Sequence, residues 1–179
     1  MREVVLYLAV SLDGYLADRA GGVGWLSGPD GAWEGVENSY PEFLRGVDTV
    51  VMGWNTYRQV AEELAPGEWL YRDLTSYVVT HRTPPPNGEV IFTHEAPAAL
   101  IRRLRAGAGR KIWICGGADL AGQLLAEDLI DRLHLTVTPV LLGGGKRLFG
   151  PRPRMRYLRL ADTRRYGELV DLVYTRLEP

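Results

Sequence analysis

Apolar runs of strand length alternate with segments of helical spacing along the first two-thirds of the chain. The runs at 47–52 and 111–115 are rich in apolar and β-branched residues, which is typical of buried parallel strands. Segment 95–106 instead places Leu100, Ile101 and Leu104 on one side and arginines on the other, which predicts an amphipathic helix. The expected strands are roughly 3–11, 47–52, 75–80, 89–92, 111–115, 132–140, 155–161 and 167–177. The expected helices are roughly 38–45, 55–64, 95–106 and 118–127.

The order of these elements predicts an α/β protein with three layers. Alternation of strand and helix favours a mostly parallel central sheet flanked by helices. The last third is strand after strand, so we expect antiparallel C-terminal strands and a mixed sheet. The 179 residues contain no low-complexity linker, and this length suits a single domain spanning 1–179. The glycine-rich segment 21–35 is expected to be a long irregular loop of the kind that often serves as a lid.

Composition narrows the class of protein without naming a function. The net charge of −1 gives no general attraction to nucleic acids or membrane surfaces, and we expect neither as a partner. Cys115 is the only cysteine, which excludes an internal disulfide and a CxxC pair. The three histidines lack metal-ligand spacing, so no metal site is expected. The apolar N-terminus has no cleavage pattern and no run approaches membrane-spanning length, so a cytoplasmic protein is expected.

Two expected strands end in glycine directly before an expected helix. The strand expected at 47–52 is followed by Gly53, and the strand expected at 111–115 is followed by Gly116 and Gly117. Glycine allows close approach of a ligand to the backbone, and the start of a helix attracts anions. A third run, 76–80, ends in a polar and basic turn instead. These features favour a phosphate-rich ligand such as a dinucleotide, although ordinary turns and helix caps use the same residues.

Other sequence signals restrict the chemistry. No GxGxxG fingerprint, GxxxxGK[ST] loop or GxSxG elbow occurs, which argues against an ordinary Rossmann site, a P-loop and a serine hydrolase. Asp13 follows the first strand and precedes Gly14, so it is either an ordinary turn residue or a functional acid.

Together the motifs resemble the dihydrofolate reductase superfamily, and in particular the reductase domain of the riboflavin-biosynthesis deaminase–reductase. The resemblance rests on SLDGYLA at 11–17, VMGxxTY at 51–57, GG at 116–117 and PVLLGGG at 139–145, and it extends to about Gly150. It implies a dihydrofolate reductase-like sheet and transfer of hydride from NADPH to a small heterocycle, such as a pterin or an aminopyrimidine. A fused deaminase is excluded, because one cysteine cannot supply the zinc signature.

The resemblance also implies where a dinucleotide would lie. Ala9 and Leu16 would lie near the nicotinamide, and a loop from Ala17 to about Trp25 would close over it. The remaining residues would follow the phosphates and the adenosine ribose. The residues assigned to the cofactor are Ala9, Leu16, Ala17, Gly53, Trp54, Thr56, Thr80, His81, Arg82, Gly116, Gly117, Ala118, Asp119 and Leu120. Trp54 and Asp119 stand where relatives carry arginine. NADPH is therefore expected first, with NADH as the alternative.

The proton donor is less well defined by the resemblance. Folate reductases use a carboxylate on the first helix, but the corresponding register holds Ser39. Glu37 lies nearby, Asp13 belongs to the family motif, and Thr136 corresponds to a polar residue of the same cleft. We take Asp13, Glu37 and Thr136 as the candidate catalytic residues.

Two further expectations remain open. A non-catalytic nucleotide- or ligand-binding module on the same fold is the alternative function, because the acid of the first helix is missing. Relatives of the riboflavin branch pair through their late strands, so we expect a homodimer, with 169–174 at the paired edge.

Overall fold

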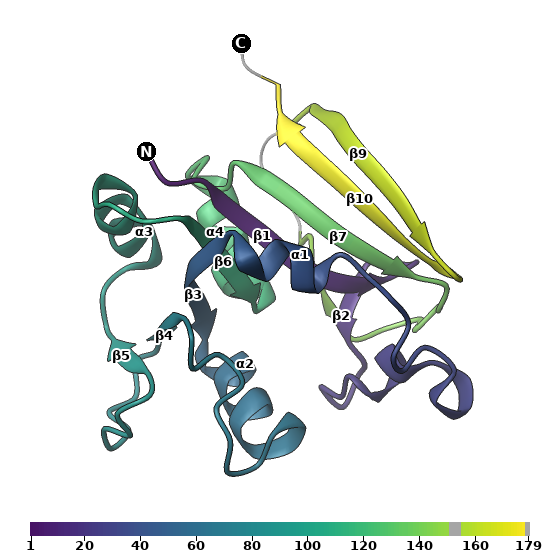
Figure 1. Cartoon of the computed structure of the whole chain (residues 1–179), viewed down its shortest axis with the longest axis horizontal. Coiled ribbons are helices and arrows are strands. Elements are labelled where there is room, and N and C mark those ends of the chain that lie inside the picture. The colour runs from purple at the N-terminus through teal and green to yellow at the C-terminus, as the bar shows by residue number, and fades with distance from the viewer. Residues whose placement is uncertain (151–154, 178–179) are drawn as a thin grey trace.

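The computed structural model describes residues 1–150 and 155–177, with an eight-stranded sheet through the centre (Figure 1). The sheet order is β5-β4-β3-β6-β1-β7-β10-β9. Its strands are β1 (Val4–Ser11), β3 (Val47–Gly53), β4 (Thr75–Val79), β5 (Ile91–Thr93), β6 (Lys111–Gly116), β7 (Arg132–Thr138), β9 (Leu158–Tyr166) and β10 (Leu169–Arg176). Two short strands, β2 (Tyr15–Ala17) and β8 (Lys146–Arg147), pair separately.

The direction of the strands confirms the predicted mixed sheet. Five adjacent pairs, from β5 across to β7, are parallel. β10 is antiparallel to both β7 and β9. Because the carboxyl ends of parallel strands meet at one edge, the turns after β1, β3, β4 and β6 lie along the same edge of the sheet.

Helices cover both faces, which gives the predicted three layers. α3 (Pro97–Ala106) and α4 (Ala118–Ala126) pack on one face through Leu100, Ile101 and Leu124. On the other face lie α1 (Tyr40–Arg45), α2 (Trp54–Arg58) and the π-helical turn Gln59–Leu64 that continues α2. None of the helices in the described ranges is long and apolar enough to cross a membrane.

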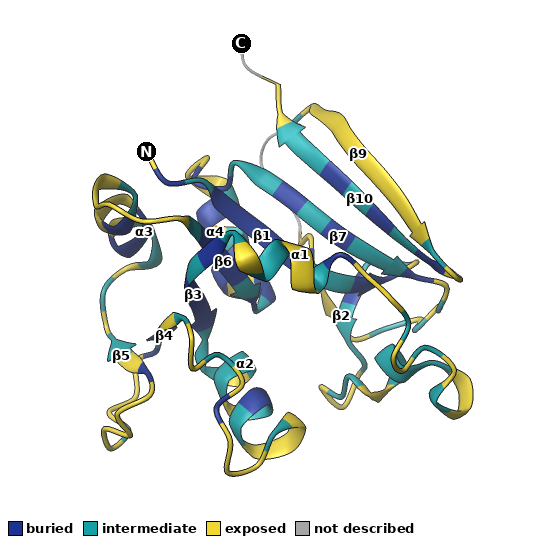
Figure 2. Ribbon diagram, viewed as in Figure 1, coloured by how far each residue is buried: buried dark blue, intermediate teal, exposed yellow. Residues whose placement is uncertain are grey.

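Three expectations need correction. The helix expected at 55–64 changes from α to π geometry after Arg58. The strand expected at 155–161 is instead Leu158–Tyr166, and its exposed polar residues lack the alternation that would have marked it. β10 is an interior strand between β7 and β9, so 169–174 is not an edge of the sheet. β9 is the edge, exposed along nearly its whole length (Figure 2), and pairing of two copies stays a prediction.

The segment expected to be irregular, 21–35, contains two short 3-10 turns at Gly24–Ser27 and Pro29–Gly31. The short pair β2–β8 was also missed, because two or three residues are too few to produce a periodic pattern.

An ion pair between the buried Arg2 and the partly exposed Asp48 joins the beginnings of several strands. Arg2, with a side chain 8% exposed, forms a salt bridge and hydrogen bond with Asp48 and donates to Thr49 Oγ1 at 2.7 Å. It also donates to the carbonyl oxygen of Arg110 at 2.8 Å. Asp48 in turn accepts the backbone N–H of Arg110 at 2.6 Å. These contacts fix the loop before β6 against β1 and β3.

We expect Asp48→Ala to lower the free energy of unfolding by about 3 kcal/mol, because it leaves the Arg2 guanidinium buried without its counter-ion. Urea unfolding followed by tryptophan fluorescence measures the change. Arg72→Ala is the control, since Arg72 is 57% exposed and its pairs with Glu68 and Glu89 are surface contacts, so about 0.5 kcal/mol or less is expected. Equal effects of the two substitutions would contradict this account.

Candidate functional site

Four residues expected at the cofactor phosphates come together where β3 and β6 end: Gly53, Thr56, Gly116 and Gly117. Met52 of β3 pairs with Gly116 of β6. A methyl group built on Gly116 would lie 3.3 Å from Thr56 Oγ1, and one built on Gly53 would lie 3.9 Å from the backbone nitrogen of Gly117. Gly116 has a φ of +137°, which residues with a Cβ rarely adopt. Both strand ends thus carry backbone without side chains, and β6 leads directly into the N-terminus of α4.

At the start of α4, an acidic side chain is paired with a basic side chain from a distant part of the sequence. Ala118 and Leu120 are buried and hold the first turn of the helix in the core. Asp119 is exposed, and both of its carboxylate oxygens lie 2.9 Å from Lys146 Nζ. Lys146 comes from β8, where it pairs with Ala17 of β2. An unpaired Asp119 carboxylate would repel a phosphate, as like charges do, but here Lys146 is its cationic partner.

The turn after β4 faces the turn after β3. Thr80 is buried, and its Oγ1 accepts a hydrogen bond of 3.0 Å from the backbone N–H of Arg82. The guanidinium carbon of Arg82 lies 5.4 Å from the centre of the Trp54 ring, a cation–π contact. His81 between them is exposed. Trp54 thus holds a cation from another loop beside the turn after β3.

The residues expected at the nicotinamide lie around the end of β1. Ala9 is partly buried and pairs with Thr136 of β7. Leu16 and Ala17 belong to β2, and Leu16 packs against the core on the face covered by α3 and α4. The structure therefore places these residues at the same edge of the sheet as the glycine turns.

A buried carboxylate, Asp171 of β10, lies at the centre of a hydrogen-bonded cluster beside this edge. Thr136 Oγ1 donates to its Oδ1 at 2.6 Å, and the Ser39 hydroxyl donates to its Oδ2. His134 Nε2 lies 2.9 Å from the same Oδ2 and 3.1 Å from Ser39 Oγ. The Tyr7 hydroxyl lies 3.1 Å from Ser39 Oγ. We call Asp171, Thr136, Ser39, His134 and Tyr7 the acid cluster.

Electrostatics keep the central carboxyl ionised. Asp171 is 1% exposed, and burial alone would raise the pKa of its carboxyl. Hydrogen bonds from His134, Ser39 and Thr136 outweigh burial, so the pKa of Asp171 lies below its usual value. Since an ionised carboxylate only accepts hydrogen bonds, Nε2 of His134 must carry the hydrogen that faces it.

The candidate catalytic residues have different surroundings. Thr136 belongs to the acid cluster. Asp13 accepts hydrogen bonds from Ser11 Oγ at 2.7 Å, Leu142 N at 3.1 Å and Gly143 N at 2.8 Å, which tie the turn after β1 to the glycine-rich loop before β8. Glu37 is exposed ahead of α1, and no described hydrogen bond or ion pair links it to the acid cluster. A role for Asp13 or Glu37 in proton transfer stays a prediction.

The sequence reasoning missed Asp171 and His134, although a signal was present. Leu169, Asp171 and Val173 alternate along β10 and are all buried. A charged residue at a buried position of an otherwise apolar strand needs partners, and His134 and Thr136 provide them from alternating positions of β7. Ser39 stands where folate reductases were expected to have a carboxylate on the first helix. Its hydroxyl instead donates a hydrogen bond to a carboxylate of β10, that of Asp171.

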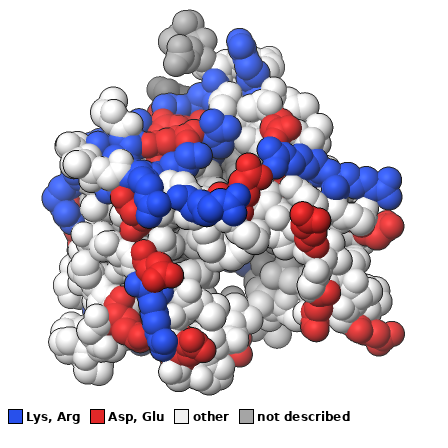
Figure 3. Space-filling view, viewed as in Figure 1, with Lys and Arg blue, Asp and Glu red and all other residues white. Residues whose placement is uncertain are grey.

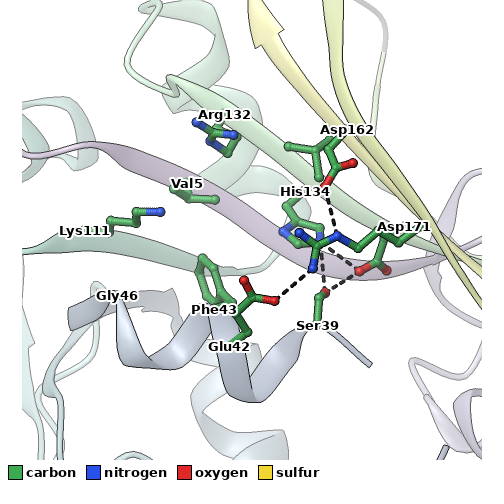
Figure 4. A pocket seen from close by; sticks show the side chains of 12 residues that line it. Val5, Ser39, Glu42, Phe43, Gly46, Lys111, Arg132, His134, Asp162 and Asp171 are labelled. Carbon is green, nitrogen blue, oxygen red and sulfur yellow. Dashed lines mark hydrogen bonds and ion pairs between the residues drawn. The ribbon is translucent and has the colours of Figure 1, made fainter. Parts of the chain in front are cut away.

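A cavity of about 290 Å³ opens beside the acid cluster, on the face covered by α1 (Figure 4). Its floor is formed by the buried Ser39 and Asp171 and by the partly buried His134. At its mouth Arg164 of β9 bridges Glu42 of α1 at 2.8 Å and Asp162 at 3.0 Å. Acidic and basic side chains lie side by side over this face of the molecule (Figure 3). Within residues 1–150 and 155–177, no group of three or more His, Cys, Asp or Glu side chains could hold a metal ion.

Comparison with known proteins shows the family. A model of the RibD C-terminal domain matches residues 2–172, so the chain belongs to this family and the resemblance predicted from the motifs is confirmed. YwjB of Bacillus subtilis, an uncharacterized protein, is 42% identical over 176 residues, which is 98% of each chain. A crystal structure from Shewanella sp. PV-4, described as that of a riboflavin biosynthesis protein, matches with a TM-score of 0.85 at 30% identity, over 99% of this chain and 100% of that one.

A bifunctional protein has the same fold. It is the diaminohydroxyphosphoribosylaminopyrimidine deaminase/5-amino-6-(5-phosphoribosylamino)uracil reductase of Thermotoga maritima. The match has a TM-score of 0.68 at 12% identity and covers 98% of this chain and 57% of that one. At this identity the match shows the shared fold alone.

We expect Asp171→Asn to lower the free energy of unfolding by about 1–3 kcal/mol at pH 7, because an amide cannot accept all the hydrogen bonds made to the carboxylate. The folded-state pKa of Asp171 is lowered. Its contribution is therefore present above the unfolded value of about 4 and is lost as pH falls through the lower folded value. Urea unfolding between pH 7 and pH 3 measures both effects.

Asp162→Asn is the matched control, since Asp162 is 46% exposed and pairs only at the cavity mouth. The wild type and the control should lose stability more steeply than Asp171→Asn below about pH 4. Parallel pH curves for wild type and Asp171→Asn would show that this carboxylate contributes nothing to the acid sensitivity of the fold.

Proposed function

We propose that this protein is an NADPH-dependent reductase that transfers hydride to a small heterocycle such as an aminopyrimidine or a pterin. The register of three neighbouring strands carries the proposal. Ala9 of β1 pairs with Thr136 of β7, and Thr136 pairs with Asp171 of β10. Since adjacent strands lie about 4.8 Å apart, a nicotinamide at Ala9 would be within about 10 Å of the acid cluster.

The edge formed by β3, β4 and β6 fits a dinucleotide. A Cβ on Gly116 would lie only 3.3 Å from Thr56 Oγ1, whereas one on Gly53 would make an ordinary contact with Gly117 N at 3.9 Å. Glycine at such a turn allows the backbone to approach a phosphate closely. The N-terminus of α4 follows directly, with its unpaired N–H groups. Arg82, held over Trp54, supplies positive charge for the 2′-phosphate that distinguishes NADPH from NADH.

Reduction of a C=N or C=C bond requires a hydride and a proton, and a bound NADPH supplies the hydride. The residues of the chain position the acceptor and deliver the proton to it. Thr136 presents its hydroxyl between Ala9 and Asp171, and the ionised Asp171 fixes the direction of that hydroxyl. A carboxylate at this place also suits hydrogen bonding to the N–H groups of a pyrimidine or pterin ring.

The family and its neighbours support the substrate class. The RibD C-terminal domain gives the family its name, and the Thermotoga maritima neighbour is described as a 5-amino-6-(5-phosphoribosylamino)uracil reductase. The present chain corresponds to 57% of that bifunctional protein. Acceptors for a first assay are therefore this aminopyrimidine, dihydrofolate and dihydropterins.

We expect saturable quenching of tryptophan fluorescence on titration with NADPH, because Trp54 lies beside the proposed cofactor edge. We further expect oxidation of NADPH, followed at 340 nm, with at least one acceptor of this panel. Absence of quenching at millimolar NADPH and NADH would contradict the proposal. Binding without turnover of any acceptor would instead favour a nucleotide-binding module on this fold.

Arg82→Gln should weaken NADPH binding about 10- to 100-fold, because a charge-assisted hydrogen bond to a phosphate is worth about 1.5–3 kcal/mol. Binding of NADH, which lacks the 2′-phosphate, should change little. Arg102→Gln is the matched control, since Arg102 lies on α3 at the opposite face and pairs with Glu127. Equal loss of NADPH and NADH affinity in Arg82→Gln would assign Arg82 to the loop structure rather than to the 2′-phosphate.

A further inference from the structure

His134 lies between the cavity and the buried carboxylate. Its side chain is 12% exposed and lines the cavity, whereas the side chain of Asp171 behind it is 1% exposed. Nε2 of His134 reaches Asp171 Oδ2 at 2.9 Å. The other carboxylate oxygen, Oδ1, is occupied by Thr136, on the side toward Ala9. The cavity and the proposed acceptor position thus lie on opposite sides of one carboxylate.

The reduction proposed above consumes one proton in every turnover, and that proton must be replaced. Asp171 is ionised by its surroundings, so it cannot hold a proton in reserve near neutral pH. Histidine is the side chain whose charge changes most readily in this range, and its two ring nitrogens can receive a proton on one side and release it on the other. His134 is the histidine of the described chain that contacts the acid cluster.

We propose that His134 carries protons from solvent in the cavity to the Asp171–Thr136 pair during each reduction cycle. This inference rests on the proposed reductase function. Hydride bonds to a carbon of the acceptor, and the dihydronicotinamide is oxidised. The Thr136 hydroxyl gives its proton to the acceptor nitrogen, forming the N–H bond, and recovers a proton through the carboxyl of Asp171, which is protonated only during the transfer. Nε2–H of His134 supplies that proton to Asp171, and Nδ1 takes one proton from a hydronium ion in the cavity, which leaves water. Exchange of the ring protons with solvent then restores Nε2–H.

The surroundings of His134 suit this role. Charged side chains at the mouth pair with one another, Arg164 with Glu42 and Asp162, which leaves the floor of the cavity to His134 and Asp171. The titratable and charged groups that face the cavity or the ring from the surrounding elements are Tyr7 of β1, Glu42 of α1, Lys111 of β6, Arg132 of β7, Asp162 and Arg164 of β9, and Asp171 of β10. The cavity volume of about 290 Å³ is also large enough for an added imidazole molecule.

His134→Gln tests the proposal, with the acceptor of the panel that the wild type reduces. We expect kcat at pH 7 to fall about 10²- to 10³-fold, as for loss of a general acid, while KM changes less than about threefold. Wild-type kcat should decrease about tenfold per pH unit on the alkaline side, and this limb should be absent in His134→Gln. Added imidazole should restore part of the lost rate.

Arg102→Gln is the control, because Arg102 lies on α3 at the opposite face of the sheet and pairs with Glu127, so this variant should keep the wild-type profile. An unchanged kcat in folded His134→Gln, or a raised KM with unchanged kcat, would overturn the proposal and make the cavity part of the acceptor site. Retained NADPH binding in that variant would leave the proposed function intact.

One readout does not need an acceptor. In ¹⁵N NMR of the wild type we expect the neutral His134 ring to carry its proton on Nε2, facing Asp171, and we expect Asp171→Asn to change this tautomer balance. A neutral ring protonated on Nδ1 would overturn the relay even if the reductase activity is found.

Discussion

Burial of the Asp171 carboxylate is the constraint on which the site depends. An ion with 1% exposure is stable only if its oxygens are hydrogen-bonded, and the donors come from two other elements. Ser39 stands at the start of α1, while His134 and Thr136 lie on β7. The hydrogen bonds to this one carboxylate therefore fix the position of α1 over the sheet and the register of β10 against β7. The floor of the cavity follows from the same contacts.

The second constraint is the parallel direction of β1, β3, β4 and β6. It brings the turns after these strands to one edge, where Gly53 and Gly117 are only partly buried and Arg82 lies over Trp54. The antiparallel β10 then enters the sheet next to β7 and places an acid beside that edge. In the proposed function, the parallel half of the sheet holds the cofactor and the antiparallel part provides the proton chemistry.

Sequence reasoning predicted the parts of this arrangement that depend on local pattern. Apolar runs followed by glycine located β3 and β6, and the order of motifs identified the family. The acid cluster could not be predicted in the same way, because its members are far apart in the sequence; the bond from Ser39 to Asp171 alone spans 132 residues. Similarly, Asp119 looked unfavourable for an anion until β8 brought Lys146 to it. Whether a charged residue favours or opposes binding of an anion therefore depends on the partners that the fold brings next to it.

β9 is an element whose bounds the sequence pattern could not predict. Its residues are exposed on both faces, so no periodicity distinguishes the strand from a polar loop. Only pairing with β10 defines it, through contacts from Tyr166 opposite Leu169 to Leu158 opposite Arg176. Through Arg164, this edge strand nevertheless forms the mouth of the cavity.

A crystal structure of the protein with NADPH tests the central claim most directly. The account predicts the diphosphate at Gly53, Gly116 and Gly117, the adenosine ribose near Thr80 and Arg82, and the nicotinamide beside Ala9, facing Thr136. A cofactor bound at another edge of the sheet, or a nicotinamide directed away from the acid cluster, would contradict it.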